Sequence, residues 1–241
     1  MNKEYLKGVL DAKLSALLTE NDYNVFASFD EQKQIDFFLN LNLVQTKLVN
    51  DFEALAKIAR KELSMEIEKY VTKNNLIYLY FFGEVERKKD VYKTARHRNE
   101  LYQKISATGY PSLADFVNKN HYIRNLVMIY RSKSQNIAKE HVEKSLLAQN
   151  IVSSEQMASL CGTTKETIVQ YVNSELSLNL ANDVSSVQFE EELENYLRKQ
   201  IKDYAFSPDV EATLIYYINE KLYEIYTLRK IYYTKGLKLD A

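Results

Sequence analysis

Glycine, proline and cysteine are scarce in this chain of 241 residues, which has five glycines, two prolines, one cysteine and no tryptophan. So few glycines and prolines leave little material for β-hairpins or tight loops. Neighbouring glycines lie more than twenty residues apart, which excludes a glycine-rich phosphate-binding loop. The single cysteine, Cys161, excludes a disulfide framework and a cluster of thiolate metal ligands. These absences favour a protein that is helical almost throughout.

Long apolar runs are also absent. The best candidate, "NLIYLYFFG" at 75–83, is far shorter than the roughly 20 apolar residues that a membrane helix needs. The opening residues "MNKEYLKGVLDAKLS" have no apolar core of the kind found in secretion signals. Acidic and basic residues are mixed along the chain and balance to a net charge of −1, which gives no attraction to a polyanion. We therefore expect a cytoplasmic protein that does not itself span a membrane.

Apolar residues recur with a helical period. In the last segment, Leu214, Ile218, Ile225 and Leu228 fall on one stripe, which predicts a single long helix entered after Ser207 and Pro208. Other helix starts are indicated by a residue that caps the amino end, at Thr19, Ser28, Ser112 and Thr163. The polar stretch 173–188 is predicted to be a loop or a short-helix connector. The pattern predicts an all-α fold of about nine helices.

One helical segment occurs twice. "KNHYIRNLVMIYRSKS" at 119–134 and "KLYEIYTLRKIYYTKG" at 221–236 match when displaced by 102 residues. The paired positions are Ile123 with Ile225, Leu126 with Leu228, Ile129 with Ile231, Tyr130 with Tyr232, Ser132 with Thr234, and Lys133 with Lys235. A repeat of this length predicts a duplicated helical unit, in which each copy completes its core by packing on neighbouring helices.

Motifs for enzymatic chemistry are missing. No GxSxG, HExxH or CxxC sequence occurs, and His97, His121 and His141 each lack a second metal ligand at helical spacing. Glu194 and Arg198 are four residues apart, which suggests an ion pair on a solvated helix face. We predict no catalytic, cofactor-binding or metal-binding residues, and expect Cys161 to be a half-buried residue at a helix end.

Residues 153–172, "SSEQMASLCGTTKETIVQYV", have the pattern of a helix-turn-helix. A short helix ends near Cys161, a glycine turn follows, and a second helix directs Ile168 and Val172 inward. Its outward residues include one cation, Lys165, and one anion, Glu166, whereas binding to a DNA duplex requires several cations against phosphates. A DNA-binding regulator is therefore an alternative hypothesis that the charge pattern does not favour.

The last helix has two further features. Arg229 lies within the apolar stripe, so we expect it to be at least partly buried and paired with a neighbouring group or to anchor an interface. Tyrosines crowd the same helix and exceed what one face buries, which predicts a partner surface. The crowded tyrosines are Tyr216, Tyr217, Tyr223, Tyr226, Tyr232 and Tyr233, and all of them except Tyr232 are assigned to the predicted surface.

The residues from Lys89 onward resemble the C subunits of archaeal and bacterial V-type ATPases, which are equivalent to the d subunits of the eukaryotic enzymes. The final segment is similar to the end of that family, where a Glu-Ile-x-x-Leu-Arg motif leads to Lys-Gly-Leu. The matching residues here are Glu224, Ile225, Leu228, Arg229, Lys235, Gly236 and Leu237. The earlier copy resembles the family's preceding repeat at Asp90, Gly109, Asn125, Leu126, Arg131 and Lys133, while Tyr122 stands where the family has Asp. The segment "LLTENDYNVF" resembles the family's entry segment.

The resemblance implies a single all-helical domain, 1–241, built as a funnel or socket from three related units. These would be an abbreviated first unit at 1–88, a second at 89–150 and a third at 151–241. It also implies a non-catalytic central-stalk protein that binds the stalk and the membrane rotor ring, without a cofactor and without nucleic acid. Such a protein is peripheral on the inner face of the membrane and couples ATP hydrolysis or synthesis to ion transport. A generic helical adaptor remains a further alternative.

Overall fold

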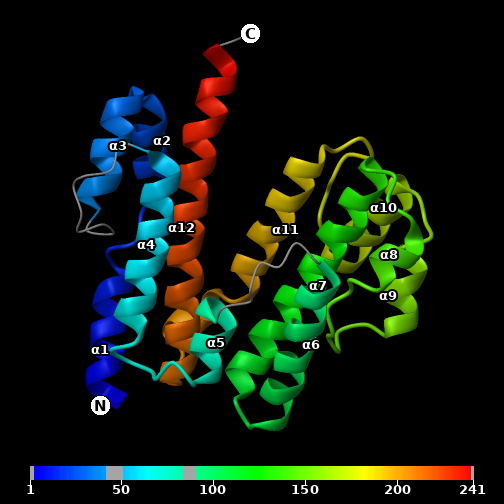
Figure 1. Cartoon of the computed structure of the whole chain (residues 1–241), viewed down its shortest axis with the longest axis horizontal. Helices are drawn as coiled ribbons and strands as arrows, with labels where there is room; N and C mark the ends of the chain where they lie inside the picture. The colour runs from blue at the N-terminus through cyan, green and yellow to red at the C-terminus, as the bar shows by residue number, and fades with distance from the viewer. Residues whose placement is uncertain (1–2, 42–50, 84–90, 240–241) are drawn as a thin grey trace. The chain divides into compact units, whose positions relative to one another are not determined.

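A computed structural model describes residues 3–41, 51–83 and 91–239, and within them the side chains of 91 and 235–239 are not described. All regular structure in these ranges is helical, so the predicted all-α fold class is confirmed (Figure 1). The chain divides into two compact units, of which unit 1 is Met1–Gly83 with Tyr204–Ala241 and unit 2 is Glu84–Asp203. The predicted third segment, 151–241, is thus shared between the two units.

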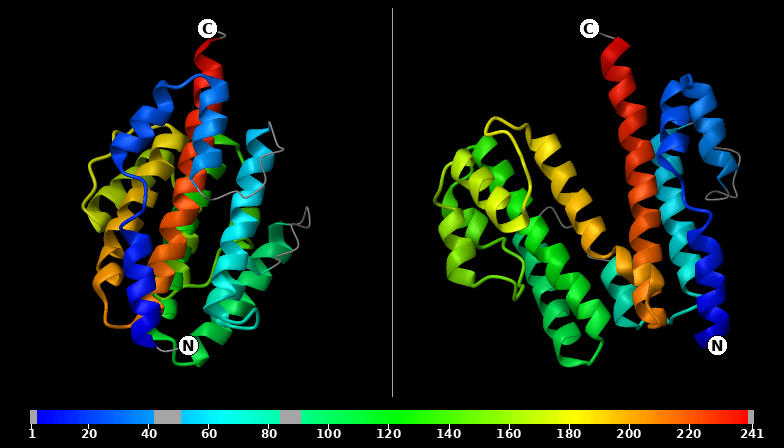
Figure 2. Two further views of the ribbon diagram at one scale, coloured as in Figure 1. Left: turned by 90° about the vertical axis from the view of Figure 1, so that its left-hand side faces the viewer. Right: turned by 180° about the vertical axis from the view of Figure 1, so that it is seen from behind.

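Unit 1 is built around a long carboxyl-terminal helix. Its helices are α1 (Lys3–Leu14), α2 (Glu20–Ser28), α3 (Glu31–Asn40), α4 (Phe52–Ile67), α5 (Leu76–Phe82) and α12 (Val210–Leu239). Helix α12 packs against α1, α2 and α4, and Figure 2 shows α12 beside α4 from two sides. Contacts of Glu53 with Arg229 and of Glu66 with Tyr217 show that α4 runs antiparallel to α12.

The core of unit 1 is rich in phenylalanine. Phe26, Phe38 and Phe52 come from three different helices and are fully buried against Ile225 and Leu228 of α12. Their tilted and edge-on ring contacts are the arrangements that aromatic quadrupoles favour. The last helix of the chain therefore closes the core that α2, α3 and α4 begin.

Unit 2 surrounds a second long helix. Its helices are α6 (Val91–Ala107), α7 (Pro111–Ser134), α8 (Lys139–Glu143), α9 (Ser154–Leu160), α10 (Lys165–Leu176) and α11 (Ser186–Gln200), after which a short 3-10 helix (Lys202–Phe206) leads to α12. Helix α7 packs against α6, α8, α10 and α11 and is buried along most of its circumference. A helix covered on nearly all sides is the structural centre of its unit.

The described residues form twelve α-helices, so the expectation of about nine was too low. The additional helices include α5 and α8, which have only seven and five residues and are too short to show a periodic apolar pattern. The predicted connector 173–188 is a loop only between Leu176 and Ser186, because α10 extends into its beginning and α11 starts before its end. No helix in the described ranges combines the length and apolar character that a membrane crossing requires.

Helix starts were predicted with mixed success. Thr19 forms the expected capping box with Asp22. Elsewhere the cap lies one or two residues further on, at Asp30 rather than Ser28 and at Thr164 rather than Thr163. Several neighbouring polar residues satisfy a capping pattern equally well in sequence, and packing decides among them. Helix α7 begins at the proline before Ser112 with no side-chain cap, and α12 begins at Val210, two residues after the predicted proline.

The repeated segments occupy the central helix of each unit. Ile123 and Leu126 of α7, and their counterparts Ile225 and Leu228 of α12, are all buried. Each pair therefore faces the core of its own unit at the same position in the repeat.

The repeated tyrosine also packs alike in the two units. Tyr130 of α7 stacks on Phe189 of α11 with the ring centroids 4.0 Å apart. Tyr232 of α12 stacks on Phe52 of α4 with the ring centroids 4.4 Å apart. Both hydroxyls donate a hydrogen bond, to the Val184 carbonyl and to a carboxylate of α3 respectively. The match between the two segments thus extends from sequence to side-chain packing.

Candidate functional site

Asn125, a predicted motif residue, fastens a loop to α7. Its side chain is buried and spans the backbone of Leu147. The amide Nδ2 donates to the Leu147 carbonyl at 2.8 Å, and Oδ1 accepts from the Leu147 N–H at 2.8 Å. A carboxamide is the side chain that satisfies both groups of one residue's backbone at once. Asn125 therefore replaces the hydrogen bonds that the loop would otherwise make to water.

Other side chains of α6 and α7 bind the same loop, residues 146–150. Asn99 donates to the Leu146 carbonyl at 3.1 Å and accepts from the Ala148 N–H at 2.7 Å. Asn118 accepts from the Asn150 N–H at 3.0 Å. The loop is thereby held through its backbone along its whole length, and we call this set of contacts the loop clamp. Side chains bind a backbone segment here in the way that a protein binds a peptide, but the bound segment is part of the same chain.

His121 completes the loop clamp and is fully buried. Its Nδ1 lies 2.7 Å from the Ala148 carbonyl, so the neutral ring carries its proton on Nδ1. Burial lowers the pKa of His121 from 6.5 to about 4, with smaller contributions from the positive charges of Arg98 and Arg124, while the Ala148 hydrogen bond acts in the opposite sense. The residue is structural and neutral at physiological pH.

The loop clamp could have been anticipated from the polar residues of α7, although they match no catalytic or metal-binding motif. Asn118, His121 and Asn125 are spaced three and then four residues apart, so they form a polar stripe along one face of a mostly apolar helix. A polar stripe on a buried helix predicts bonding partners inside the fold, since buried polar groups are almost always satisfied. A search for catalytic or metal-binding motifs does not detect such a stripe.

Arg131 and Lys133, the other motif residues of α7, also make contacts within unit 2. Arg131 forms an ion pair with Glu190 of α11, and its side chain is 46% exposed. Lys133 donates to the carbonyl of Cys161 at the end of α9. Both cations fix neighbouring elements to α7. Cys161 itself is buried, more deeply than predicted, and burial raises the pKa of its thiol.

Glu224, the acidic motif residue of α12, anchors the segment before α2. Its carboxylate accepts from the Leu18 N–H at 2.5 Å and contacts the Lys221 ammonium at 2.6 Å. The side chain is 3% exposed. Burial raises the pKa of Glu224, and the Lys221 charge together with the two hydrogen bonds partly offsets that increase.

Replacing Glu224 with glutamine should change how stability depends on pH. A carboxyl group whose pKa is raised by folding stabilises most below its unfolded pKa of 4.5 and loses that contribution as pH rises. Glutamine keeps an oxygen for the Leu18 N–H but does not ionise. We expect Glu224→Gln to gain stability relative to the wild type as pH rises above 4.5, measured by urea unfolding at pH 4.5 and 7.5. A difference between the two proteins that stays constant with pH would contradict this expectation.

Arg229 is paired and about half-buried, in line with the expectation that it is at least partly buried. Its Nε lies 2.6 Å from a carboxylate oxygen of Glu53 on α4, and its side chain is 48% exposed. Helix α4 covers the arc of α12 that contains Ile225 and Leu228, which leaves Arg229 at the edge of the buried face. Its guanidinium also lies 5.9 Å from the ring of Tyr233.

The tyrosines of α12 divide into two groups. Tyr217 is buried, and its hydroxyl donates to Glu66 of α4 at 3.0 Å. The prediction that Tyr217 belongs to a partner surface was therefore wrong. Tyr226 and Tyr233 are 45% and 44% exposed and lie seven residues apart, hence on one face. Tyr216 and Tyr223 share that face and are partly buried. We call these last four residues the tyrosine face. Lys235, the remaining predicted residue, lies in α12 but its side chain is outside the described set.

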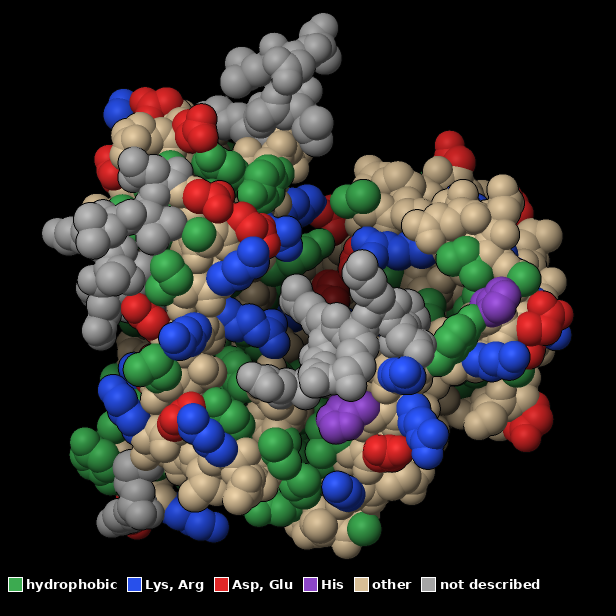
Figure 3. Space-filling view, in the orientation of Figure 1, with side chains coloured by type: hydrophobic (Ala, Val, Ile, Leu, Met, Phe, Trp, Pro, Cys, Tyr) green, Lys and Arg blue, Asp and Glu red, His purple; other side chains and the backbone are tan. Residues whose placement is uncertain are grey.

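The segment 153–172 does form two helices joined by a turn, α9 and α10. Ile168 and Val172 point inward, as predicted. The Lys165 ammonium lies 5.2 Å above the ring of Tyr130, so the cation expected to reach a phosphate is engaged within the unit. On the face drawn in Figure 3, basic side chains are scattered among acidic and apolar ones. This arrangement does not favour binding to a DNA duplex.

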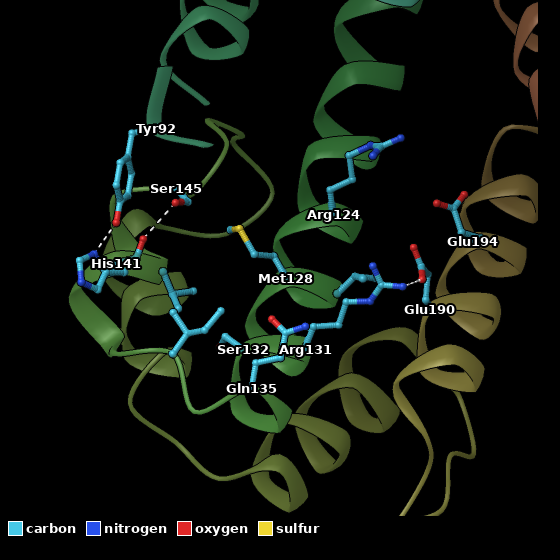
Figure 4. A pocket seen from close by; sticks show the side chains of 13 residues that line it. Tyr92, Arg124, Met128, Arg131, Ser132, Gln135, His141, Ser145, Glu190 and Glu194 are labelled. Carbon is cyan, nitrogen blue, oxygen red and sulfur yellow. Dashed lines mark hydrogen bonds and ion pairs between the residues drawn. The ribbon is translucent and has the colours of Figure 1, made fainter. Parts of the chain in front are cut away.

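An open groove of about 980 Å³ runs along α7 in unit 2. Arg124, Met128, Arg131 and Gln135 form its floor at helical spacing (Figure 4). One wall is α11, and the other is α8 with its preceding turn and Tyr92 of α6. The wall residues are Tyr92, Ile137, His141, Val142, Ser145, Glu190 and Glu194. We call this feature the α7 groove.

Charge in the α7 groove is distributed unevenly. Arg131 is paired with Glu190, and Nε of the exposed Arg124 donates to Asn120 at 2.8 Å. Glu194 is only partly exposed, contrary to the solvated position predicted for it. Burial raises the pKa of Glu194, the positive charges of Arg124 and Arg198 lower it, and the negative charge of Glu190 raises it further.

Within the described residues, no three His, Cys, Asp or Glu side chains gather closely enough to hold a metal ion. Neither the known protein families nor the curated proteins include a match for this chain.

Proposed function

We propose that this protein is a non-catalytic central-stalk component of a V-type ATPase. In that role it would link the rotating stalk to the membrane rotor ring and couple ATP hydrolysis or synthesis to the transport of protons or sodium ions. It would act in the cytoplasm, attached to the inner face of the membrane through its partners and without crossing the bilayer. The proposal begins from the resemblance of residues 89–241 to the C subunits and d subunits of that family.

The observation that carries the proposal is the repeated packing of α7 and α12. Two of the three paired apolar positions are buried in both helices, and the paired tyrosine of each helix stacks on a phenylalanine of a neighbouring helix. A chain made of related helical units is what the resemblance implies. The motif residues Asn125, Arg131 and Glu224 hold helices and loops in place, which suits a part that transmits force.

The decisive test is purification of the tagged full chain from gently solubilised native membranes, followed by mass spectrometry. We expect rotor-ring and central-stalk proteins to copurify in near-stoichiometric amounts. Recovery of the protein alone, or with soluble partners only, would contradict the proposal. The generic adaptor and the DNA-binding regulator would then be tested by the identity of those partners and by gel retardation at low salt.

The tyrosine face supplies a functional test in the assembled complex. Removing two exposed aromatic rings from a contact surface weakens the contact without touching a nucleotide site. We expect Tyr226→Ala with Tyr233→Ala to lower ion transport relative to ATP hydrolysis while KM for ATP stays unchanged. Tyr5→Ala, at a more exposed tyrosine of α1, is the matched control and should leave coupling intact. A changed KM for ATP in the double variant would count against a purely mechanical role.

A further inference from the structure

The loop clamp bonds its loop along two opposite edges of the backbone. Asn125 of α7 bonds both the N–H and the carbonyl of Leu147. Asn99 of α6 bonds the carbonyl of the residue before Leu147 and the N–H of the residue after it. In an extended chain, successive residues direct these groups to alternate sides, so α6 and α7 bond the loop as two neighbouring strands would in a sheet. The alternation ends at the carbonyl of Ala148, which is bonded by His121 of α7.

The clamp contacts the backbone of the loop rather than its side chains. All six hydrogen bonds from Asn99, Asn118, His121 and Asn125 end on main-chain atoms. In the described stretch 146–152 no side chain is buried, since Asn150 and Ile151 are exposed and the others are partly exposed. These hydrogen bonds therefore depend on the form of the backbone and not on the identity of the side chains.

A segment held in this way is able to detach without unfolding its unit. Local opening is least costly where few apolar contacts are lost, and the released N–H and carbonyl groups form hydrogen bonds with water. Helix α7 differs from the loop, because Leu126 and Ile129 are fully buried. The helices that carry the clamp thus remain folded when the loop leaves.

We propose that the loop clamp is a binding site for an extended peptide segment of a partner protein, which takes the place of the loop 146–150. The segment is defined by its backbone, because it must offer both an N–H and a carbonyl to Asn125. Proline at the position of Leu147 has no N–H and is excluded. The loop belongs to the same chain and competes at a high effective concentration, so it occupies the site when the partner is absent.

This inference goes beyond the proposed function and does not depend on it. The clamp and the loop both lie within unit 2, and the ligand is defined by its chemistry alone. The tests therefore use the purified full chain with no ATPase component present.

Hydrogen exchange of the wild-type chain tests whether the loop leaves on its own. We expect the amides of Leu147 and Ala148 to exchange at rates that low urea concentrations hardly change, because local opening exposes little surface. The amides of Leu126 and Ile129 should exchange through unfolding of unit 2 and accelerate steeply with urea. Equal protection and equal urea dependence of the two sets would overturn the proposal.

Binding of a peptide then tests the vacated site, with affinity measured by fluorescence anisotropy. The probe is a labelled peptide with the sequence KSLLAQNIV of residues 144–152. Leu147→Pro removes the N–H that Asn125 accepts, so the loop of this variant competes poorly. We expect this variant to bind the probe at least about tenfold more tightly than the wild type does. Leu147→Ala keeps the N–H and is the matched control, which should bind the probe as the wild type does.

A second peptide tests whether the backbone is what the site recognises. This peptide carries proline at the position of Leu147 and should bind the Leu147→Pro chain at least about tenfold more weakly than the probe. Circular dichroism checks that the variant is folded, and the hydrogen-exchange test requires no variant. Failure of the folded variant to bind the probe, or equal affinities for the two peptides, would overturn the inference and leave the proposed ATPase role untouched.

Discussion

Replacing Asn125 with leucine should destabilise unit 2 by about 2 kcal/mol, because the two backbone groups that it bonds are partly buried. Leucine has a similar size but leaves both the N–H and the carbonyl of Leu147 without the partners they now have at 2.8 Å. Each buried backbone group left unsatisfied costs about 1–3 kcal/mol. Because a domain is stable by only about 5–15 kcal/mol, the loss would be a large part of the total. Urea unfolding of the full chain measures the change.

The effect of Asn125→Leu should be local as well as large. We expect hydrogen exchange of the amides in 146–150 to accelerate, since these residues are held by the loop clamp. Asn179→Leu provides the matched control, because Asn179 is exposed in the loop after α10 and surface changes there cost less than about 0.5 kcal/mol. If Asn125→Leu lowered the free energy of unfolding by less than about 1 kcal/mol, water would be making the hydrogen bonds to Leu147 in place of Asn125. The structural role assigned to Asn125 would then be wrong.

Acid should weaken unit 2 through His121. Folding lowers the pKa of this residue from 6.5 to about 4, so the unfolded chain binds a proton more readily than the folded chain between those values. The stabilising contribution of neutral His121 is therefore complete above pH 6.5 and is lost as pH falls towards 4. A difference of this size corresponds to about 3 kcal/mol, which urea unfolding at pH 4, 5 and 6.5 would detect.

Two histidine variants separate His121 from the other titrating groups. His121→Asn retains a donor near the position of Nδ1, and although it leaves a cavity it cannot take up a proton. We expect the decline in stability between pH 6.5 and 4 to become shallower in this variant. His97→Asn changes an exposed histidine of α6 and should leave the decline as in the wild type. An unchanged decline in His121→Asn would show that the burial of His121 is not its cause.

The helical fold was predictable because its causes are local. The scarcity of glycine and proline and the spacing of Ile218, Ile225 and Leu228 are properties of short stretches, and they are sufficient to predict long helices. The exact helix starts depend on which of several polar neighbours packing leaves free to cap, as at Asp30 and Thr164. The division into two units depends on contacts between segments far apart in the sequence, such as α4 with α12, and periodicity carries no information about these.

The candidate site was predictable only in part, because it too depends on contacts between segments far apart in the sequence. Motif matching identified Asn125 and Glu224, but their partners Leu147 and Leu18 are ordinary residues that only the fold brings close. A helical wheel indicated that Arg229 is partly buried, but it could not identify Glu53 of α4 as the partner, because the wheel gives the direction of a side chain and not the position of the neighbouring helix. The α7 groove is lined by residues of four helices, α6, α7, α8 and α11, so no single stretch of sequence indicates it.

The order of the units along the chain has a consequence for synthesis on the ribosome. Unit 2 is one continuous stretch, whereas unit 1 combines the first helices with α12, and Leu228 of α12 is buried in the phenylalanine core. Translation proceeds from the amino end, so unit 2 acquires all its helices while the core of unit 1 still lacks its last wall. While unit 2 is being synthesised, the core of unit 1 therefore lacks the α12 residues that cover Phe26, Phe38 and Phe52. Until α12 has been made, the three helices that carry these residues therefore present the kind of apolar surface that chaperones bind.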